Sequence, residues 1–438
     1  MIDAASRALS ALSPLAAEAA REGPSVAGIP VEFILFGLTL VGVALFHHHT
    51  LRVALVGLAS ITVYKLLFTG FRHGDGLAGL ASHLGHEWVI LVNLLLLLLG
   101  FGLLAQHFEK SEIPLVLPRF LPDDWKGGFV ALVMVFVLSS FLDNIAAAMI
   151  GGAMAHTLFR GKVHIGYLAA IVAASNAGGA GSVVGDTTTT MMWIAGVSPI
   201  AVLEGFVGSG VALAIFGIPA ALKQHRYSPI VKDPPKGTHV DWARAGIVAL
   251  VLVAAISTNV VVNLRFTEAA DHFPFIGVAV WVALLASVAV RKPDWGIVGE
   301  SFKGSVFLLS LVTCASMMPG EKLPAASAGT TLGLGFVSAV FDNIPLTALA
   351  LAQGGYDWGV LAYAVGFGGS MIWFGSSAGV AITNVFPQGR SVGSWLKHGW
   401  HVAVAYVVGF FVLLTLLGWH PTPQRRDLAP VAPATEQH

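Results

Sequence analysis

Long apolar stretches, separated by short polar segments, are the dominant pattern along this chain. A helix that crosses the hydrocarbon core of a membrane needs about 20 mostly apolar residues. Stretches of this kind predict membrane-spanning helices near 29–46, 50–69, 88–106 and 199–221, and again near 243–263, 276–290, 303–318 and 398–418. The pattern therefore predicts an all-α polytopic membrane protein.

Four further segments are apolar at both ends and polar or glycine-rich in the middle. A straight helix over 128–159 would be far longer than a bilayer is thick. We therefore predict re-entrant hairpins over 128–159 and 329–352, with polar tips where protein or water can surround the non-helical backbone. Segments 165–195 and 359–386 are predicted to cross the membrane as broken helices. In the first of these, the breaking residues are expected to be Gly178, Gly179, Gly181 and Gly185.

The polar centres of these segments form a motif that occurs twice. The sequence SSFLDNI at 139–145 corresponds to SAVFDNI at 338–344. Downstream, the Gly-Gly and Gly-Asp-Thr elements of 178–187 correspond to the Gly-Gly and Gly-Ser-Ser elements of 368–377 at the same spacing. Each half then has five spans, and an odd number of spans inverts the second half relative to the first. We predict two inverted repeats, each with a re-entrant hairpin and a broken helix.

The repeats and the charged loops give a predicted domain organisation. The chain divides into an N-terminal arm (1–27), repeat 1 (28–222), a cytoplasmic linker (223–242), repeat 2 (243–420) and a C-terminal tail (421–438). Most of the 24 lysines and arginines fall in loops on one predicted face, which the positive-inside rule assigns to the cytoplasm. Both termini are then expected to be external, in a multi-pass protein of a bacterial-type inner (plasma) membrane.

Composition supports the membrane assignment. The 438 residues are 55% hydrophobic and only 11% charged, whereas soluble domains carry about 25% charged residues. The lipid bilayer is therefore an expected partner. The net charge of zero gives no indication of nucleic-acid binding. With a single cysteine, Cys314, the chain cannot form an internal disulfide.

In this arrangement four polar clusters converge near the middle of the membrane: Asp143-Asn144, 176–190, Asp342-Asn343 and 370–384. They contain carboxylate, amide and hydroxyl oxygens, the ligands that hard cations prefer, and no lysine or arginine. Desolvation raises the pKa of a carboxylate, so a proton and a monovalent cation can compete for the same oxygens. We expect Asp143 and Asp186 to form this competitive site and Asp342 to support it.

Three other interpretations of these motifs are open. In the first, a Na⁺- or H⁺-coupled carrier of an organic or inorganic anion, such as citrate or a dicarboxylate, would bind Na⁺ with the same oxygens. An intramembrane aspartyl hydrolase using Asp143 and Asp186 would have glycine where this chain has Val183, and it gives no reason for the second motif copy. Alternatively, the Asp-Asn pairs are helix caps and the Gly-Gly pairs are ordinary helix packing. Exchange of a cation for a proton, with no enzymatic activity and no cofactor besides the transported ions, explains both copies.

The motifs resemble those of a known family. The sequence NAGGA at 176–180, GDTT at 185–188 and the paired Asp-Asn motifs are similar to those of NhaD-type Na⁺/H⁺ antiporters. These belong to the ion transporter superfamily, which also contains arsenite-efflux and citrate/dicarboxylate carriers. The resemblance implies a scaffold domain, a transport domain, elevator-like movement, a homodimer, and exchange of Na⁺ or Li⁺ for H⁺. The implied cation and proton site comprises Asp143, Asn144, Asn176, Asp186, Thr187, Thr188, Ser338, Asp342, Asn343 and Ser377, and the repeat adds Ser376 as the counterpart of Asp186.

Two histidine clusters and one lysine lie outside these motifs. His47-His48-His49 is predicted at a turn between helices, and His73, His83 and His86 in an external loop. We expect solvated side chains there rather than a zinc site, because no cysteine accompanies them. Lys65, inside a predicted span, is expected to snorkel toward the membrane interface.

Overall fold

The computed structural model describes residues 23–46, 49–72, 74–116, 120–231, 239–266, 269 and 272–422. Most of the predicted arm (1–27), the middle of the linker (223–242) and nearly all of the tail (421–438) lie outside these residues, as do His47, His48 and His73. Among the described residues, helices make up the fold apart from a short antiparallel ribbon of β1 (Ser25–Val26) and β2 (Ile29–Pro30).

The helices follow one another along the chain with short connections. The first half contains α2 (Val31–Leu45), α3 (Thr50–Tyr64), the π-helical turn η1 (Lys65–Thr69), α4 (Gly76–Glu109), α5 (Ile113–Val116), α6 (Trp125–Ser139), α7 (Asn144–Leu158), α8 (Ile165–Ala180), α9 (Thr187–Ile194), α10 (Pro199–Leu203) and α11 (Gly205–Tyr227). The second half contains α12 (Trp242–Arg265), α13 (Phe275–Ser287), η4 (Trp295–Ile297), α14 (Val298–Ser316), η5 (Gly320–Lys322), α15 (Ala328–Ser338), α16 (Asn343–Gln353), α17 (Trp358–Gly368), α18 (Ser377–Val385), η6 (Pro387–Arg390) and α19 (Val392–Leu417).

The described helices are those of a multi-pass membrane protein. Large apolar side chains point outward, including Leu38 of α2 at 62% exposure and Val253 of α12 at 60%. Extended apolar surface of this kind is unfavourable in water and suits a lipid environment. Helices long and apolar enough to cross a membrane are Thr50–Thr69, Gly76–Glu109, Pro199–Tyr227, Trp242–Val262 and Val392–Leu417.

Helix α4 differs from the expected span at 88–106. It begins at Gly76, so His83 and His86 lie on a helix and not in a loop as predicted. His83 is buried, and its Nε2 lies 3.1 Å from the hydroxyl oxygen of Ser316 on α14. The glycines and histidines of this segment lower its hydropathy without interrupting the helix, which explains why the apolar pattern missed its first three turns.

Lys65 does not snorkel, and that prediction is wrong. The residue is 7% exposed, and its ammonium group lies 5.9 Å from the centre of the Phe71 ring. It interacts electrostatically with Glu32 of α2 and Glu321 of η5. A buried charge is tolerated when opposite charges accompany it, so Lys65 connects three segments that are far apart in the sequence.

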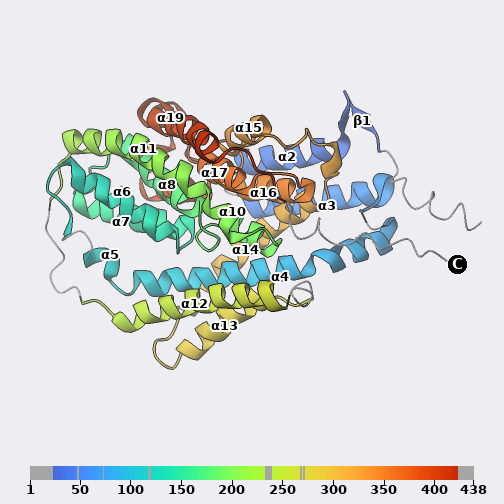
Figure 1. The fold of residues 1–438 in the computed structure, drawn as a ribbon, viewed down its shortest axis with the longest axis horizontal. Helices are drawn as coiled ribbons and strands as arrows, with labels where there is room; N and C mark the ends of the chain where they lie inside the picture. The colour runs from blue at the N-terminus through green and yellow to red at the C-terminus, as the bar shows by residue number, and fades with distance from the viewer. Residues whose placement is uncertain are drawn as a thin grey trace, which may run out of the picture.

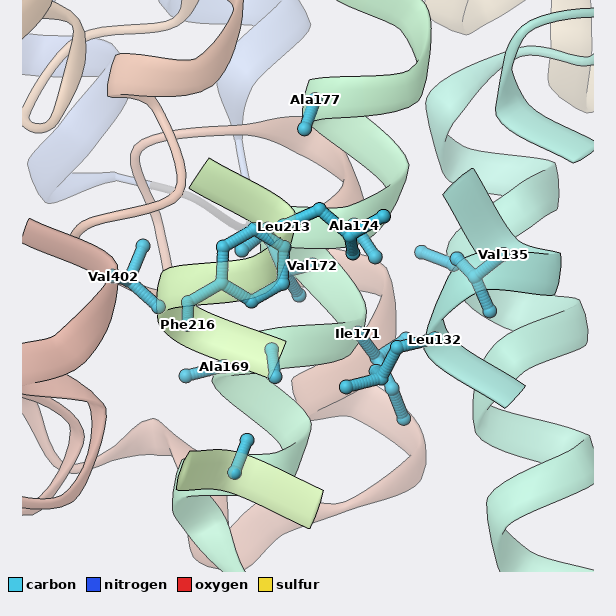
Figure 2. Packing of buried hydrophobic residues seen from close by; sticks show 14 of the residues in the cluster. Leu132, Val135, Ala169, Ile171, Val172, Ala174, Ala177, Leu213, Phe216 and Val402 are labelled. Atoms are coloured by element: carbon cyan, nitrogen blue, oxygen red, sulfur yellow. The ribbon is translucent and has the colours of Figure 1, made fainter. Parts of the chain in front are cut away.

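The densest packing surrounds α8. Every residue of this helix from Gly166 to Ala180 is buried, and most are small, so neighbouring helices approach it on all sides. Figure 2 shows Leu132 and Val135 of α6 on one side of α8 and Phe216 of α11 on another. We call this group of helices, with α9 and α16 that pack beside them, the motif body; it consists of α6, α7, α8, α9, α11, α15, α16, α17, α18 and α19.

A second group of helices forms a separate layer. Helix α4 runs along the lower side of the molecule in Figure 1, with α12 and α13 beneath it. Apolar residues of these three helices, such as Leu103, Val251 and Val280, form one buried cluster. Helix α14 packs on α4, and α3 packs on α14; these two helices complete what we call the outer body. Both polar motifs lie next to the outer body, because α16 packs on α14 and α9 packs on α4.

Candidate functional site

The two Asp-Asn motifs have the same local structure. Asp143 lies in the turn between α6 and α7, and Asp342 lies in the turn between α15 and α16. Their backbone angles are φ −53°, ψ 144° and φ −53°, ψ 142°. In each case the carboxylate accepts a 3.1 Å hydrogen bond from the backbone N–H two residues on, at Ile145 and Ile344. The aspartates therefore cap α7 and α16, and capping also fixes where their carboxylates point.

The two glycine-rich segments interrupt helices. Residues 181–186 separate α8 from α9, and Asp186 caps α9 by accepting a 3.1 Å hydrogen bond from the Thr188 N–H. Residues 369–376 separate α17 from α18, which Ser376 caps. Gly178 and Gly179, predicted to break the helix, instead remain within α8. At Gly178 the close approach of the Phe136 backbone leaves no room for a β-carbon.

Asp186 is the point at which the clusters meet. Asp186 and Asn144 both lie against Gly179. A β-carbon on this glycine would lie 2.9 Å from Asp186 Cβ. The Asn343 amide donates to Asp186 Oδ2 over 3.5 Å. Asp186 also interacts electrostatically with Asp143 and Asp342. Side chains from both halves of the chain thus surround one carboxylate that is 3% exposed.

Asn176 of α8 joins the two broken helices directly. Its amide nitrogen donates to the hydroxyl oxygens of Ser370 and Ser376, each over 3.0 Å. Its carbonyl oxygen Oδ1 is buried and has no hydrogen-bond partner among the residues that the structure describes. Buried polar atoms are nearly always satisfied, so an unpaired acceptor marks a position where a cation or a donor group fits.

A cavity of about 910 Å³ lies between these residues and the outer body. The predicted site residues that line it are Asp143, Asn144, Asn176, Asp186, Thr187, Asn343, Ser376 and Ser377. Residues of α4 and α14, including Gln106, Ser301 and Ser305, form the opposite wall. The cavity therefore brings together predicted site residues from all four clusters.

Three predicted site residues are not among the described residues that line the cavity: Thr188, Ser338 and Asp342. Ser338 donates its hydroxyl proton to the Val365 carbonyl over 2.8 Å. The Asp342 carboxylate accepts from the Ser377 hydroxyl over 2.9 Å as well as from Ile344 N–H. Ser338 and Asp342 therefore stabilise the second motif from behind the cavity wall.

Sequence reasoning missed several residues that shape the site. Gly366 faces Asp186, because a β-carbon there would lie 3.4 Å from Asp186 Oδ2. The sequence repeat could have identified Gly366 as a site residue, since it occupies the position that corresponds to Asn176. Thr190 lies in the predicted 176–190 cluster but was not named as a site residue; its hydroxyl donates a 3.0 Å hydrogen bond to the Val183 carbonyl in the loop of the broken helix. Gln106 and Ser301 carry no motif, so nothing in the sequence singled them out.

No protein-family model matches this chain. Curated proteins do match it at low identity. Sodium/proton antiporter 1 of Arabidopsis thaliana is 28% identical over 293 residues, which cover 59% of this chain and 49% of the relative. The Na⁺/H⁺ antiporter NhaD of Alkalimonas amylolytica is 27% identical over 315 residues, covering 59% and 62%. The NhaD protein of Vibrio parahaemolyticus is 27% identical over 319 residues, covering 59% and 72%.

The matched region spans about half the length of the Arabidopsis relative and more of the bacterial ones. All three relatives carry names that describe transporters and not enzymes. The names agree with the family that the motifs indicated. The chain is thus a multi-pass membrane protein related to the NhaD-type sodium/proton antiporters.

Proposed function

We propose that this protein exchanges Na⁺ or Li⁺ for H⁺ across a membrane. The observation that carries the proposal is the composition of the buried site. Asp143, Asp186 and the unpaired Asn176 carbonyl line one cavity, and the charged side chains at its inner end, among the described lining residues, are all acidic. Oxygen ligands of this kind favour a small hard cation. The names of the relatives support the same activity.

Competition between the two ions follows from burial. Two carboxylates that interact electrostatically in a desolvated pocket cannot both stay ionised without a neutralising partner. Either a proton or a metal ion supplies that neutralisation, and each displaces the other from the same oxygens. Asp186 is the central acceptor, since it interacts with both Asp143 and Asp342. No covalent chemistry and no cofactor besides the transported ions is required.

We further propose that the two halves are inverted repeats with re-entrant hairpins. Matching packing supports this proposal. Gly178 packs on Phe136 in the first half, and Gly368 packs on Gly335 in the second. These pairs occupy corresponding positions in the two motif copies. Corresponding positions therefore make the same backbone contact in each half, with glycine on one side of it in both.

Alternating access would come from movement of the motif body against the outer body. Helix α16 packs along α14, whereas α7, its counterpart in the first half, lines the cavity opposite α4. If α7 moved onto α4 and α16 moved away from α14, the cavity would close on its present side and open on the opposite side of the membrane. An elevator-like movement requires this change. We place the protein in a bacterial-type inner membrane as a homodimer, with both termini external.

Flux in proteoliposomes tests the function. A pH gradient reported by an entrapped dye should collapse when Na⁺ or Li⁺ is added to the wild-type protein and not when choline is added. Asp143→Asn should abolish this response, whereas Asp123→Asn, at an exposed carboxylate, should leave it intact. Flux that needs citrate or succinate as well as Na⁺ would instead identify an anion carrier.

A further inference from the structure

The cavity connects the buried site to one end of the outer body. Both Leu94 and Lys110 of the α4 segment line it, and a helical rise of 1.5 Å per residue makes that separation about 24 Å. Its inner end holds Asn176, which is 0% exposed and has an unpaired carbonyl oxygen. Its outer end holds the exposed residues Glu109 and Lys110. The passage thus follows α4 from the middle of that helix to its end at Glu109.

Four charged side chains line this outer end: Glu109, Lys110, Glu112 and Asp294. We call them the mouth. Among the described lining residues, Lys110 is the single lysine or arginine. Its ammonium nitrogen lies 2.6 Å from Asp294 Oδ2, and the two side chains are 45% and 39% exposed. The mouth therefore carries a formal excess of negative charge that one lysine partly offsets.

The structure fixes the charges of the mouth in place. Lys110 follows the last residue of α4, and Asp294 caps η4 by accepting a 3.1 Å hydrogen bond from the Gly296 N–H. Glu112 Oε2 accepts a 3.0 Å hydrogen bond from the His239 N–H. The hydrogen bond and charge of Lys110 hold the pKa of Asp294 below its usual range, so this carboxylate is ionised at neutral pH.

We propose that the mouth is the access route of the transported cation and that Lys110 sets its apparent affinity. This inference rests on the proposed cation exchange. A narrow passage lined by one sign of charge focuses the electric field and raises the local concentration of counter-ions. Lys110 lowers the local cation concentration by pairing with Asp294, whereas Glu109 and Glu112 raise it. The unpaired Asn176 oxygen at the inner end is where the route leads.

The first test is the Na⁺ dependence of exchange. Lys110→Gln should lower the half-saturating Na⁺ concentration severalfold at low ionic strength, with an unchanged maximal rate. Glu109→Gln should raise it, and Lys110→Arg should match the wild type. Lys126→Gln is the matched control, because Lys126 is 62% exposed and lies outside the cavity. The differences should shrink as added salt shortens the screening length from about 10 Å at 0.1 M to about 3 Å at 1 M.

A second test does not depend on transport. In a Cys314→Ala protein, Ser301→Cys places one thiol on the cavity wall. A cationic methanethiosulfonate reagent should label it faster than an anionic one. Lys110→Gln should increase that ratio and Glu109→Gln should decrease it. A thiol that neither reagent reaches in the membrane, or a ratio that Lys110→Gln leaves unchanged, overturns the inference.

The two tests separate the two claims. A wild-type protein that moves no protons in response to Na⁺ would refute the proposed exchange, while the labelling ratio would still judge the mouth. Conversely, normal exchange with identical half-saturating Na⁺ in wild type, Lys110→Gln and Glu109→Gln would refute the role of Lys110 alone.

Discussion

The side-chain amide of Asn176 donates a 3.0 Å hydrogen bond to the hydroxyl of Ser376, although the two residues lie 200 positions apart in the chain. Each belongs to a different broken helix. The bond fixes the orientation of the amide, so that its carbonyl oxygen stays unpaired in a buried site. One hydrogen bond thus links the two halves and positions a candidate cation ligand.

Asn176→Ala removes this link and the candidate ligand together. A buried hydrogen-bond partner left unsatisfied costs about 1–3 kcal/mol, and each 1.4 kcal/mol of lost binding energy is tenfold in affinity. We expect the half-saturating Na⁺ concentration to rise by roughly 5- to 100-fold. Dose-dependent dye quenching in proteoliposomes measures it. Ser370→Ala, which removes the other partner of the amide but no proposed ligand, should have a smaller effect.

Gly179→Ala places a methyl group where Asn144 and Asp186 meet. A β-carbon there would lie 2.9 Å from Asp186 Cβ, too close for both residues to keep their positions, so we expect exchange to be lost and the thermal midpoint in detergent to fall. Gly210→Ala on α11 is the control, because no atom lies within 4 Å of its β-carbon position. That variant should keep both activity and stability. A fully active Gly179→Ala protein would show that Asn144 and Asp186 do not need this close contact.

Movement between the two bodies predicts that the α4 and α7 walls of the cavity approach each other. Ala105 on α4 and Ala153 on α7 face the same cavity. In a Cys314→Ala background, cysteines at these two positions should form a disulfide or short cross-link only under an imposed ion gradient. Gel mobility after oxidation reports the link. Equal cross-linking with and without a gradient would speak against a gradient-driven closure of the cavity.

The charge of Asp294 should not vary with pH in the neutral range. Lys110 lowers the pKa of Asp294 below the ordinary aspartate value of about 3.9, so this carboxylate is ionised throughout that range. The effect of Lys110→Gln on the reagent-labelling ratio should therefore be the same at about pH 6 and about pH 9. Labelling kinetics at the two pH values test this. A ratio that changes severalfold would mean that another titrating group controls the mouth.

The sequence contained strong signals for the local structure around the motifs. Asp143 and Asp342 are polar residues inside apolar segments, and a carboxylate before an apolar helix is a helix-cap signal. Asp186 could be found in the same way, because glycine precedes it and a helix follows. The all-α membrane fold could be predicted since hydropathy records burial in lipid directly.

Residues whose role depends on distant contacts could not be found in this way. Gly366 matters because Asp186 of the other half lies against it, and Gln106 matters because α4 faces the motif body. Lys65 was misjudged for the same reason, since its acidic neighbours Glu32 and Glu321 come from remote segments. Hydropathy carries no information about which helices become neighbours.

The most direct test of the account is proton release on cation binding. Purified protein in a weakly buffered detergent solution near its exchange optimum receives Na⁺, and a pH indicator records the change. The account predicts that wild-type protein releases protons in a saturable way, that choline releases none, and that Asp186→Asn abolishes the signal. Saturable Na⁺ binding without proton release, or release that persists in Asp186→Asn, would contradict the claim that both ions compete for this carboxylate.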